Sequence, residues 1–246
     1  GRVYLTGIQA LVRLPMMQRQ RDLKAGLNTG GFISGYRGSP LGMYDHALWT
    51  AKRYLKDNNI HFQPGLNEDL AATAVWGTQQ VNLFPGATVD GVFSIWYGKG
   101  PGVDRSMDVL KHGNAAGSSE HGGVIVLAGD DHGAQSSTLP HQSEQVFSAA
   151  MIPVINPANV QEYLDFGLLG FALSRYSGCW IGFKAISETV ESGASVWVDP
   201  ERIRIMMPTD FQLPPGGLGI RNPDPPMEAE RRLHGPKMAA VKAFVR

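Results

Sequence analysis

The sequence has one cysteine, Cys179, in 246 residues. A single thiol excludes an internal disulfide framework, a cysteine-based zinc site and an iron–sulfur cluster held by this chain alone. Basic and acidic residues number 22 each, and this balance gives no sign of nucleic acid or an anionic membrane as a partner. The sequence also lacks a run of about 20 apolar residues that would span a membrane, and a signal peptide. These absences favour a protein of the reducing cytoplasm.

Apolar and helical segments alternate along most of the chain. With 43% hydrophobic and 18% charged residues, the composition allows one large domain or two small ones. Helical periodicity begins in residues 6–26, where we expect a kink or break near Pro15. Apolar strands are expected within 30–40, 61–67, 90–100, 122–131, 152–157 and 179–186, with helical segments between them. This alternation predicts an α/β fold whose mostly parallel sheet is covered by helices on both faces.

The pattern changes after about residue 193. An alternating segment is followed by Pro- and Gly-rich sequence and then by a charged helical segment. We therefore expect an α/β domain over residues 1–205 and a linker over 206–228. Residues 229–246 are expected to begin a helix that leads into a following domain outside this sequence, because the helical pattern runs to the last residue.

Four loops that follow expected strands carry polar or Gly-rich sequence. In open α/β sheets, ligands bind beyond the carboxyl ends of the strands, and we expect these loops to line one crevice there. Glycine allows the close approach of backbone, and Arg37, Lys99, His132 and His141 offer donors for anionic groups. Either histidine is equally well explained as a helix cap or a polar loop residue. The loops are 34–42, 64–69, 97–106 and 129–144.

Other familiar motifs fit less well. The segment YGKGPG has the Gly-Lys pair of a phosphate-binding loop but lacks its first glycine and the Ser or Thr that holds magnesium. The pentapeptide G-x-S-x-G is absent, yet Ser, His and Asp occur on neighbouring loops, so a Ser/His hydrolase stays open as a less favoured alternative. His132 and His141 do not share a helical face, so no metal site is expected in this chain.

Taken together, the four loops resemble the thiamine diphosphate-dependent 2-oxoacid:ferredoxin oxidoreductases, most closely the indolepyruvate ferredoxin oxidoreductases in their long single-chain form. The resemblance covers nearly the whole chain. NEDLAATAVWG is similar to an E-x-x-A-A-x-x-x-x-G helix start, with Glu68 at its first position. SGYRGSPLG is similar to a strand-to-turn motif that places Ser39 near the 2-oxoacid, and GDDHGAQSSTLPHQSE to a D-D-x-G-x-x-S-S segment. GKGPGVDRSMD is similar to a further loop of the family.

The resemblance implies roles for individual residues. It implies coenzyme contacts from Glu68, Gly38, Ser39, Lys99 and Gly100. It implies substrate contacts from Arg37, Ser39, His132, Ser136 and Ser137. Arg37 and Ser39 replace the Pro and Thr that are common in the smaller, separate-subunit relatives, so the substrate contacts are expected to differ from theirs.

Glu68 is the residue on which the expected chemistry depends. Thiamine diphosphate becomes a nucleophile when a carboxyl hydrogen-bonds its pyrimidine N1′, and one well-placed Glu is enough. Ala71, Ala72 and Val75 follow on the same helical face, where we expect them to leave room for a flat ring. The plain alternative is an acid favoured by the helix dipole, with Asn67 as N-cap and the alanines packing on a sheet. We expect Asp69 to be an ordinary, solvated first-turn acid.

The sequence lacks the G-D-G…N motif that holds the diphosphate and Mg²⁺ in this family. The GDD at residues 129–131 is discounted, because Asp131 replaces the final glycine. The diphosphate site and the [4Fe-4S] clusters are therefore expected in other domains of the full enzyme, and this chain alone is not expected to be active. The resemblance predicts a pyrimidine-side domain that serves oxidative decarboxylation of an indolepyruvate-like 2-oxoacid to an acyl-CoA. Ferredoxin, coenzyme A and a second copy of the enzyme in a homodimer are the expected partners. A noncatalytic anion-binding or assembly domain of the same fold is the alternative.

Overall fold

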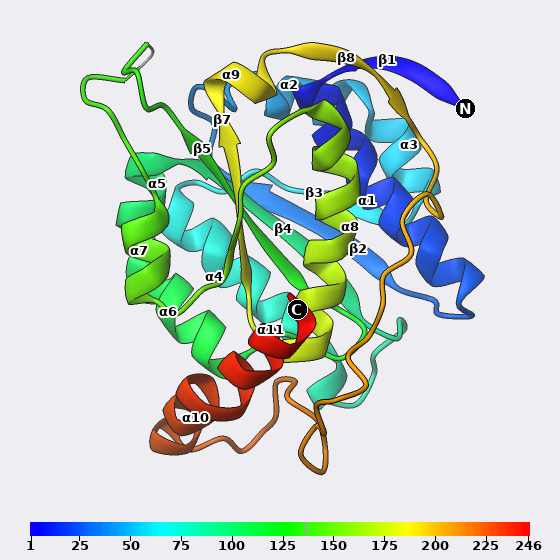
Figure 1. Cartoon of the computed structure of the whole chain (residues 1–246), viewed down its shortest axis with the longest axis vertical. Helices are drawn as coiled ribbons and strands as arrows, with labels where there is room; N and C mark the ends of the chain where they lie inside the picture. The colour runs from blue at the N-terminus through cyan, green and yellow to red at the C-terminus, as the bar shows by residue number, and fades with distance from the viewer. Residues whose placement is uncertain (136) are drawn as a thin grey trace.

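The computed structural model describes residues 1–135 and 137–246. Its centre is a six-stranded sheet with the order β3-β2-β4-β5-β7-β6, in which all neighbouring strands are parallel (Figure 1). The strands of this sheet are β2 (Gly30–Gly35), β3 (Ile60–Phe62), β4 (Val92–Lys99), β5 (Val124–Asp130), β6 (Val154–Ile155) and β7 (Ile181–Ile186). The predicted α/β class with a parallel sheet is confirmed.

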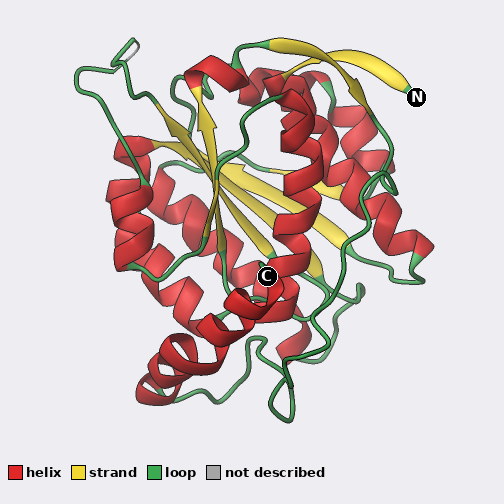
Figure 2. Cartoon of the chain, in the orientation of Figure 1, coloured by secondary structure: helices red, strands yellow, loops and turns green. Residues whose placement is uncertain are grey.

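Helices cover both faces of the sheet (Figure 2). They are α1 (Gly7–Lys24), α2 (Tyr44–Thr50), α3 (Lys52–Asp57), α4 (Glu68–Gln79), α5 (Gly100–Arg105), α6 (Met107–Ala116), α7 (Glu144–Ala149), α8 (Val160–Ser177) and α9 (Ser187–Val190). The helix α1 continues past Pro15, so the expected break does not occur; a capping box between Thr6 and Gln9 fixes its start.

Alternate residues of the central strands build two separate cores. In β5, Ile125 and Leu127 pack with α1 and α8, whereas Val124 and Val126 pack with α4 and α6. Successive side chains of a strand point to opposite faces, so a strand buried on both sides is apolar throughout. This is why the continuous apolar segments predicted the parallel sheet.

The C-terminal part packs back onto this domain. Strand β8 (Gly193–Trp197) pairs antiparallel with β1 (Arg2–Thr6) in a separate two-stranded sheet. After the irregular segment 206–225, α10 (Pro226–Arg232) and α11 (Met238–Phe244) are joined by a π-helical turn that contains the buried Lys237. Its Nζ donates to the Ala115 carbonyl oxygen of α6 at 3.1 Å. None of the described helices has both the length and the apolarity needed to cross a membrane.

A buried carboxylate joins α1, α8 and Thr29, the residue before β2. Asp22 accepts both guanidinium nitrogens of Arg175 at 2.7 and 2.8 Å. Its oxygens also accept the Gln18 amide at 2.8 Å and the Thr29 hydroxyl at 2.7 Å. Asp22 is only 3% exposed, so this bidentate pair is protected from water and salt.

We predict that Asp22→Ala lowers the free energy of unfolding by about 3–5 kcal/mol, because it leaves the Arg175 charge buried and unpaired. Urea unfolding measures the effect. The matched control is Asp57→Ala, which removes an exposed i,i+4 pair with Arg53 at 3.9 Å and is expected to cost less than about 1 kcal/mol. Equal, small losses for both variants would contradict the structural role of Asp22.

Candidate functional site

The loop 97–106 contacts each of the other three predicted loops. In the structure it comprises the end of β4, near the middle of the sheet, and the short helix α5. A Cβ atom on Gly38 would come within 2.8 Å of the Lys99 side chain, and one on Gly102 within 2.7 Å of the Glu68 side chain. From the fourth loop, His141 Nε2 lies 2.8 Å from Asp104 Oδ2. The structure therefore brings the four loops to one edge of the sheet, as the sequence predicts.

The four loops do not line any of five cavities of about 440 to 940 Å³ elsewhere on the described residues. Large apolar side chains are exposed on or beside the same loops: Tyr36, Met43, Leu66, Leu70 and Leu139.

Glu68 is the first residue of α4 and its side chain is only 13% exposed. Asn67 is the N-cap, as predicted, and its side chain accepts the Leu70 amide at 2.9 Å. The Glu68 main-chain carbonyl accepts the Trp96 indole N–H at 2.9 Å, which fastens the helix start to β4. Because Gly102 has no side chain, the Glu68 carboxyl can lie directly against α5.

Arg105 lies between the two acids of this helix start. Its Nε is 2.6 Å from Asp69 Oδ1 and 3.9 Å from Glu68 Oε2. The shorter contact is a hydrogen bond and the longer one is only an ion pair. Asp69 is 38% exposed, so it is partly solvated but paired with Arg105. Among the described residues, the Glu68 carboxylate accepts no hydrogen bond, which leaves it able to accept one from a ligand.

The expectation that alanines leave space for a ring is wrong. Ala71, Ala72 and Val75 are almost completely buried and belong to the core between α4 and the sheet. A Cβ atom on Gly65 would lie 2.7 Å from the Ala71 Cβ, so the small residues serve close packing of the helix and its preceding loop. A planar ligand would have to approach Glu68 from the loop edge.

The remaining predicted residues occupy different environments. Arg37 is exposed, and Ser39 and Lys99 are half-buried. Gly100 begins α5, and a Cβ atom there would clash with the ring of His141. His132 is exposed and Ser137 is half-buried, whereas Ser136 lies outside the described residues. Glycine at positions 38 and 100 is explained by packing between the loops.

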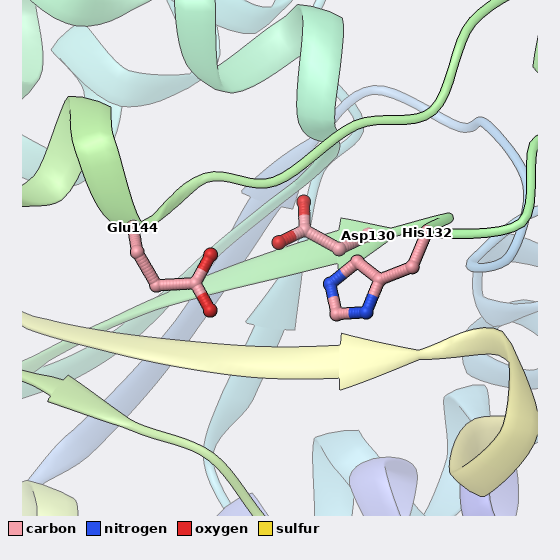
Figure 3. Close-up of side chains that lie close together, drawn as sticks. All are labelled: Asp130, His132 and Glu144. Atoms are coloured by element: carbon pink, nitrogen blue, oxygen red, sulfur yellow. The ribbon is translucent and has the colours of Figure 1, made fainter.

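A buried lysine lies below the loop 129–144. Lys184, in β7, is completely buried and its Nζ lies 3.2 Å from Asp130 Oδ2 and 3.0 Å from His132 Nε2. It also donates to Glu144 Oε1 at the start of α7. Figure 3 shows the two acids and the imidazole gathered around one small space. We call these four residues the Lys184 cluster.

The Lys184 cluster has the ligand types of a metal site, with its Asp130, His132 and Glu144 ligand atoms within 4.8 Å of one another. The ammonium of Lys184 lies within 3.2 Å of an atom of each and already supplies the positive charge. The cluster is therefore an ion-pair network closed by an internal cation. The Asp130 carboxylate is further held by Ser143, through its hydroxyl at 2.6 Å and its amide at 2.9 Å.

Sequence reasoning missed Lys184, Gly102 and Arg105. The one signal for Lys184 was a charged residue inside an otherwise apolar strand, since a lysine is rarely buried without a partner. The neighbouring histidines were noticed, but not their contacts. Among the described residues neither His132 nor His141 hydrogen-bonds a serine, so the described residues form no Ser-His pair of a hydrolase.

Comparisons with known proteins were made for the chain as a whole. No protein-family model matches the chain. Its fold resembles a 2-oxoglutarate:ferredoxin oxidoreductase from Magnetococcus marinus, solved with 2-oxoglutarate, coenzyme A and succinyl-CoA bound. The TM-score is 0.66 at 16% identity, over 100% of this chain and 46% of that one. The fold is thus one found in 2-oxoacid:ferredoxin oxidoreductases.

Curated relatives make the similarity more specific. Indolepyruvate oxidoreductase subunit IorA of Methanothermobacter marburgensis is 25% identical over 164 residues, or 66% of this chain and 24% of the relative. IorA of Archaeoglobus fulgidus is 26% identical over 178 residues, or 72% of this chain and 25% of the relative. The chain therefore spans about a quarter of the length of these relatives. Sequence and fold together support its membership of the 2-oxoacid:ferredoxin oxidoreductase family.

The Lys184 cluster predicts an acid dependence of stability. Burial raises the pKa of Glu144, but its hydrogen bond with Lys184 and the charge of that lysine outweigh this and hold the pKa below its ordinary value. A carboxyl whose pKa is lower in the folded state stabilises the fold above its ordinary pKa of about 4.3. That stabilisation is lost as the pH falls through the folded-state pKa.

We therefore expect the stability difference between wild type and Glu144→Gln to shrink as the pH falls from about 7 to about 3. Urea unfolding at a series of pH values measures it. Glu191→Gln, at an exposed acid outside the cluster, is the control and should give a nearly constant difference. A constant difference for Glu144→Gln would show that the Lys184 contact does not hold in solution.

Proposed function

We propose that this chain is the pyrimidine-side domain of a thiamine diphosphate-dependent 2-oxoacid:ferredoxin oxidoreductase. The proposed substrate is an indolepyruvate-like 2-oxoacid, which the complete enzyme would decarboxylate oxidatively to an acyl-CoA. The observation that carries the proposal is Glu68, a mostly buried carboxyl at a helix start with free hydrogen-bonding capacity at the loop edge. The similarity to the IorA subunits supports the choice of substrate class.

The described residues fit the coenzyme. When bound, thiamine diphosphate supplies a carbon nucleophile, which requires a carboxyl on the pyrimidine N1′. Glu68 would accept that hydrogen bond, and Gly102 keeps the space in which its carboxyl lies. Arg105 hydrogen-bonds Asp69 at 2.6 Å and lies 3.9 Å from Glu68 Oε2, so it places a positive charge near Glu68 without occupying its oxygens through a hydrogen bond. Gly38, Ser39, Lys99 and Gly100 would complete the coenzyme side of the edge.

The substrate would meet the same edge. Arg37 and Lys99 form no salt bridge with a described carboxylate, so their charges are available to the carboxylate of a 2-oxoacid. Ser39, His132, Ser136 and Ser137 are the further proposed substrate contacts. The same unpaired cations also favour the second candidate, a noncatalytic domain that binds an unrelated anion.

The rest of the proposed enzyme would cover this edge. Exposed Tyr36, Met43, Leu66 and Leu139 border the site and support its docking against another domain. That domain would hold the diphosphate and Mg²⁺, and others would hold [4Fe-4S] clusters that pass electrons to ferredoxin. We further propose a cytoplasmic homodimer that uses coenzyme A as acyl acceptor. This chain alone would not complete a turnover.

Glu68→Gln in the full-length protein is expected to lower 2-oxoacid decarboxylation by at least about 100-fold, because an amide cannot share a proton with the ring nitrogen as a carboxyl does. Ferredoxin-coupled and coenzyme-dependent assays measure the loss, and circular dichroism checks the fold. Asp69→Asn changes the adjacent acid and should retain most activity.

Thermal unfolding of the wild type with thiamine diphosphate and Mg²⁺ separates the two candidate functions. The coenzyme site predicts a rise in Tm with ligand concentration, whereas a noncatalytic anion-binding domain predicts none. Near-normal activity of Glu68→Gln would also overturn the proposal.

Gly102→Ala tests the position of Glu68 without removing its carboxyl. The added Cβ would lie 2.7 Å from Glu68 Cγ and 2.9 Å from its Oε1, so the carboxyl must move. We expect coenzyme-dependent stabilisation and activity to fall together. Gly77→Ala is the control, because no atom lies within 4 Å of a Cβ at that helical position. Unchanged coenzyme binding by Gly102→Ala would place the coenzyme elsewhere.

A further inference from the structure

The Lys184 ammonium has two hydrogen-bond partners, Glu144 Oε1 and His132 Nε2, and it also forms an ion pair with Asp130 Oδ2 at 3.2 Å. The two carboxylates supply negative charge on either side of it, and the lysine is completely buried. An ammonium group can only donate hydrogen bonds. His132 Nε2 must therefore be the acceptor in its contact with Lys184.

The contact fixes the form of the imidazole. A ring nitrogen that accepts a hydrogen bond carries no proton, so the single ring proton is on Nδ1 and the ring is neutral. A protonated ring would put an N–H group against the ammonium, with two donors and no acceptor between them. Figure 3 shows one ring nitrogen of His132 turned toward Glu144 and the other turned away from it.

We propose that Lys184 is a positioning residue that holds His132 as the neutral Nδ1–H tautomer, so that His132 offers a hydrogen-bond donor to an oxygen of the bound 2-oxoacid. This role rests on the proposed function and adds a specificity element to its site. His132 is exposed two residues beyond the end of β5, whereas Lys184 is buried and cannot touch a substrate. Lys184 therefore acts only through the imidazole.

A neutral N–H group fixes the direction of a hydrogen bond to a substrate oxygen but adds no positive charge. The charge that attracts the substrate carboxylate would come from Arg37 and Lys99 on the neighbouring loops. The loop that carries His132 is also tied to α5, because His141 Nε2 lies 2.8 Å from Asp104 Oδ2 and its ring packs against Gly100. The His132 ring is thus held by Lys184 of β7, while the later part of the same loop is held against α5.

The first test uses the coenzyme-free chain labelled with ¹⁵N-histidine. Long-range ¹H–¹⁵N correlation spectra report which ring nitrogen of a histidine carries the proton. The His132 signals are assigned as those that disappear in His132→Asn. We expect Nδ1–H in the wild type and in Lys184→Arg, which keeps a cationic donor. Lys184→Met should release the ring to the Nε2–H form or a mixture. An Nε2–H or doubly protonated His132 in the wild type near pH 8 would overturn the proposal.

The second test measures 2-oxoacid kinetics in the full-length protein. His132→Phe is expected to raise KM about 5- to 10-fold with a smaller change in kcat, the effect of losing one hydrogen bond to the substrate. His132→Asn, whose amide N–H lies near the position of Nδ1–H, should recover most of this loss. Because His132 is exposed, we expect both variants to fold as the wild type does.

The outcomes separate this inference from the proposed function. If thiamine diphosphate stabilises the protein but His132→Phe leaves KM unchanged, the role of His132 fails while the enzyme assignment stands. If the Nδ1–H form is found but thiamine diphosphate has no effect, the enzyme assignment fails and, with it, the substrate role, whereas the Lys184 contact itself is upheld.

Discussion

The parallel pairing of β2, β4, β5 and β7 is the constraint on which the site depends. Parallel strands end at the same edge of a sheet, so loops that are distant in sequence become neighbours. The register shows this alignment directly, with residue pairs opposite each other near the strand ends: Gly35 and Tyr97, Lys99 and Gly129, Asp130 and Ile186. Glu68 begins the helix that follows β3, and Lys184 lies in β7, so residues from well-separated strands of the sheet contribute to this side of the molecule.

The sequence predicted those features that depend on local pattern. Continuous apolar segments predicted strands buried on both faces, and Asn67 before Glu68 predicted the N-cap that the structure contains. The break expected at Pro15 was wrong, because tertiary packing along α1 outweighs the local cost of a proline. Ala71 and Ala72 were assigned to a ligand, but small residues are equally suited to close packing, and only the sheet beneath α4 decides between the two.

The contacts of Lys184 could not be predicted, because its partners are set by the strand order. Asp130, Glu144 and Lys184 come from β5, α7 and β7, and sequence spacing gives no distance between them. A lysine within an apolar strand predicts a buried partner of unknown identity. Likewise, Gly102 gave no signal for its contact with Glu68, since glycine at a helix start has several ordinary explanations.

The distribution of charge along the sheet edge links the fold to the proposed chemistry. At one side Arg105 pairs with Asp69 and lies near Glu68; at the other Lys184 pairs with Asp130 and Glu144. On each side a single cation faces two acids, so the acids there are only partly compensated. Between them lie Arg37 and Lys99, which follow or end the central strands and make no described salt bridge with a carboxylate. Arg37 and Lys99 would therefore attract an anion to the middle of this edge, which is where the proposed function would place the carboxylate of a 2-oxoacid.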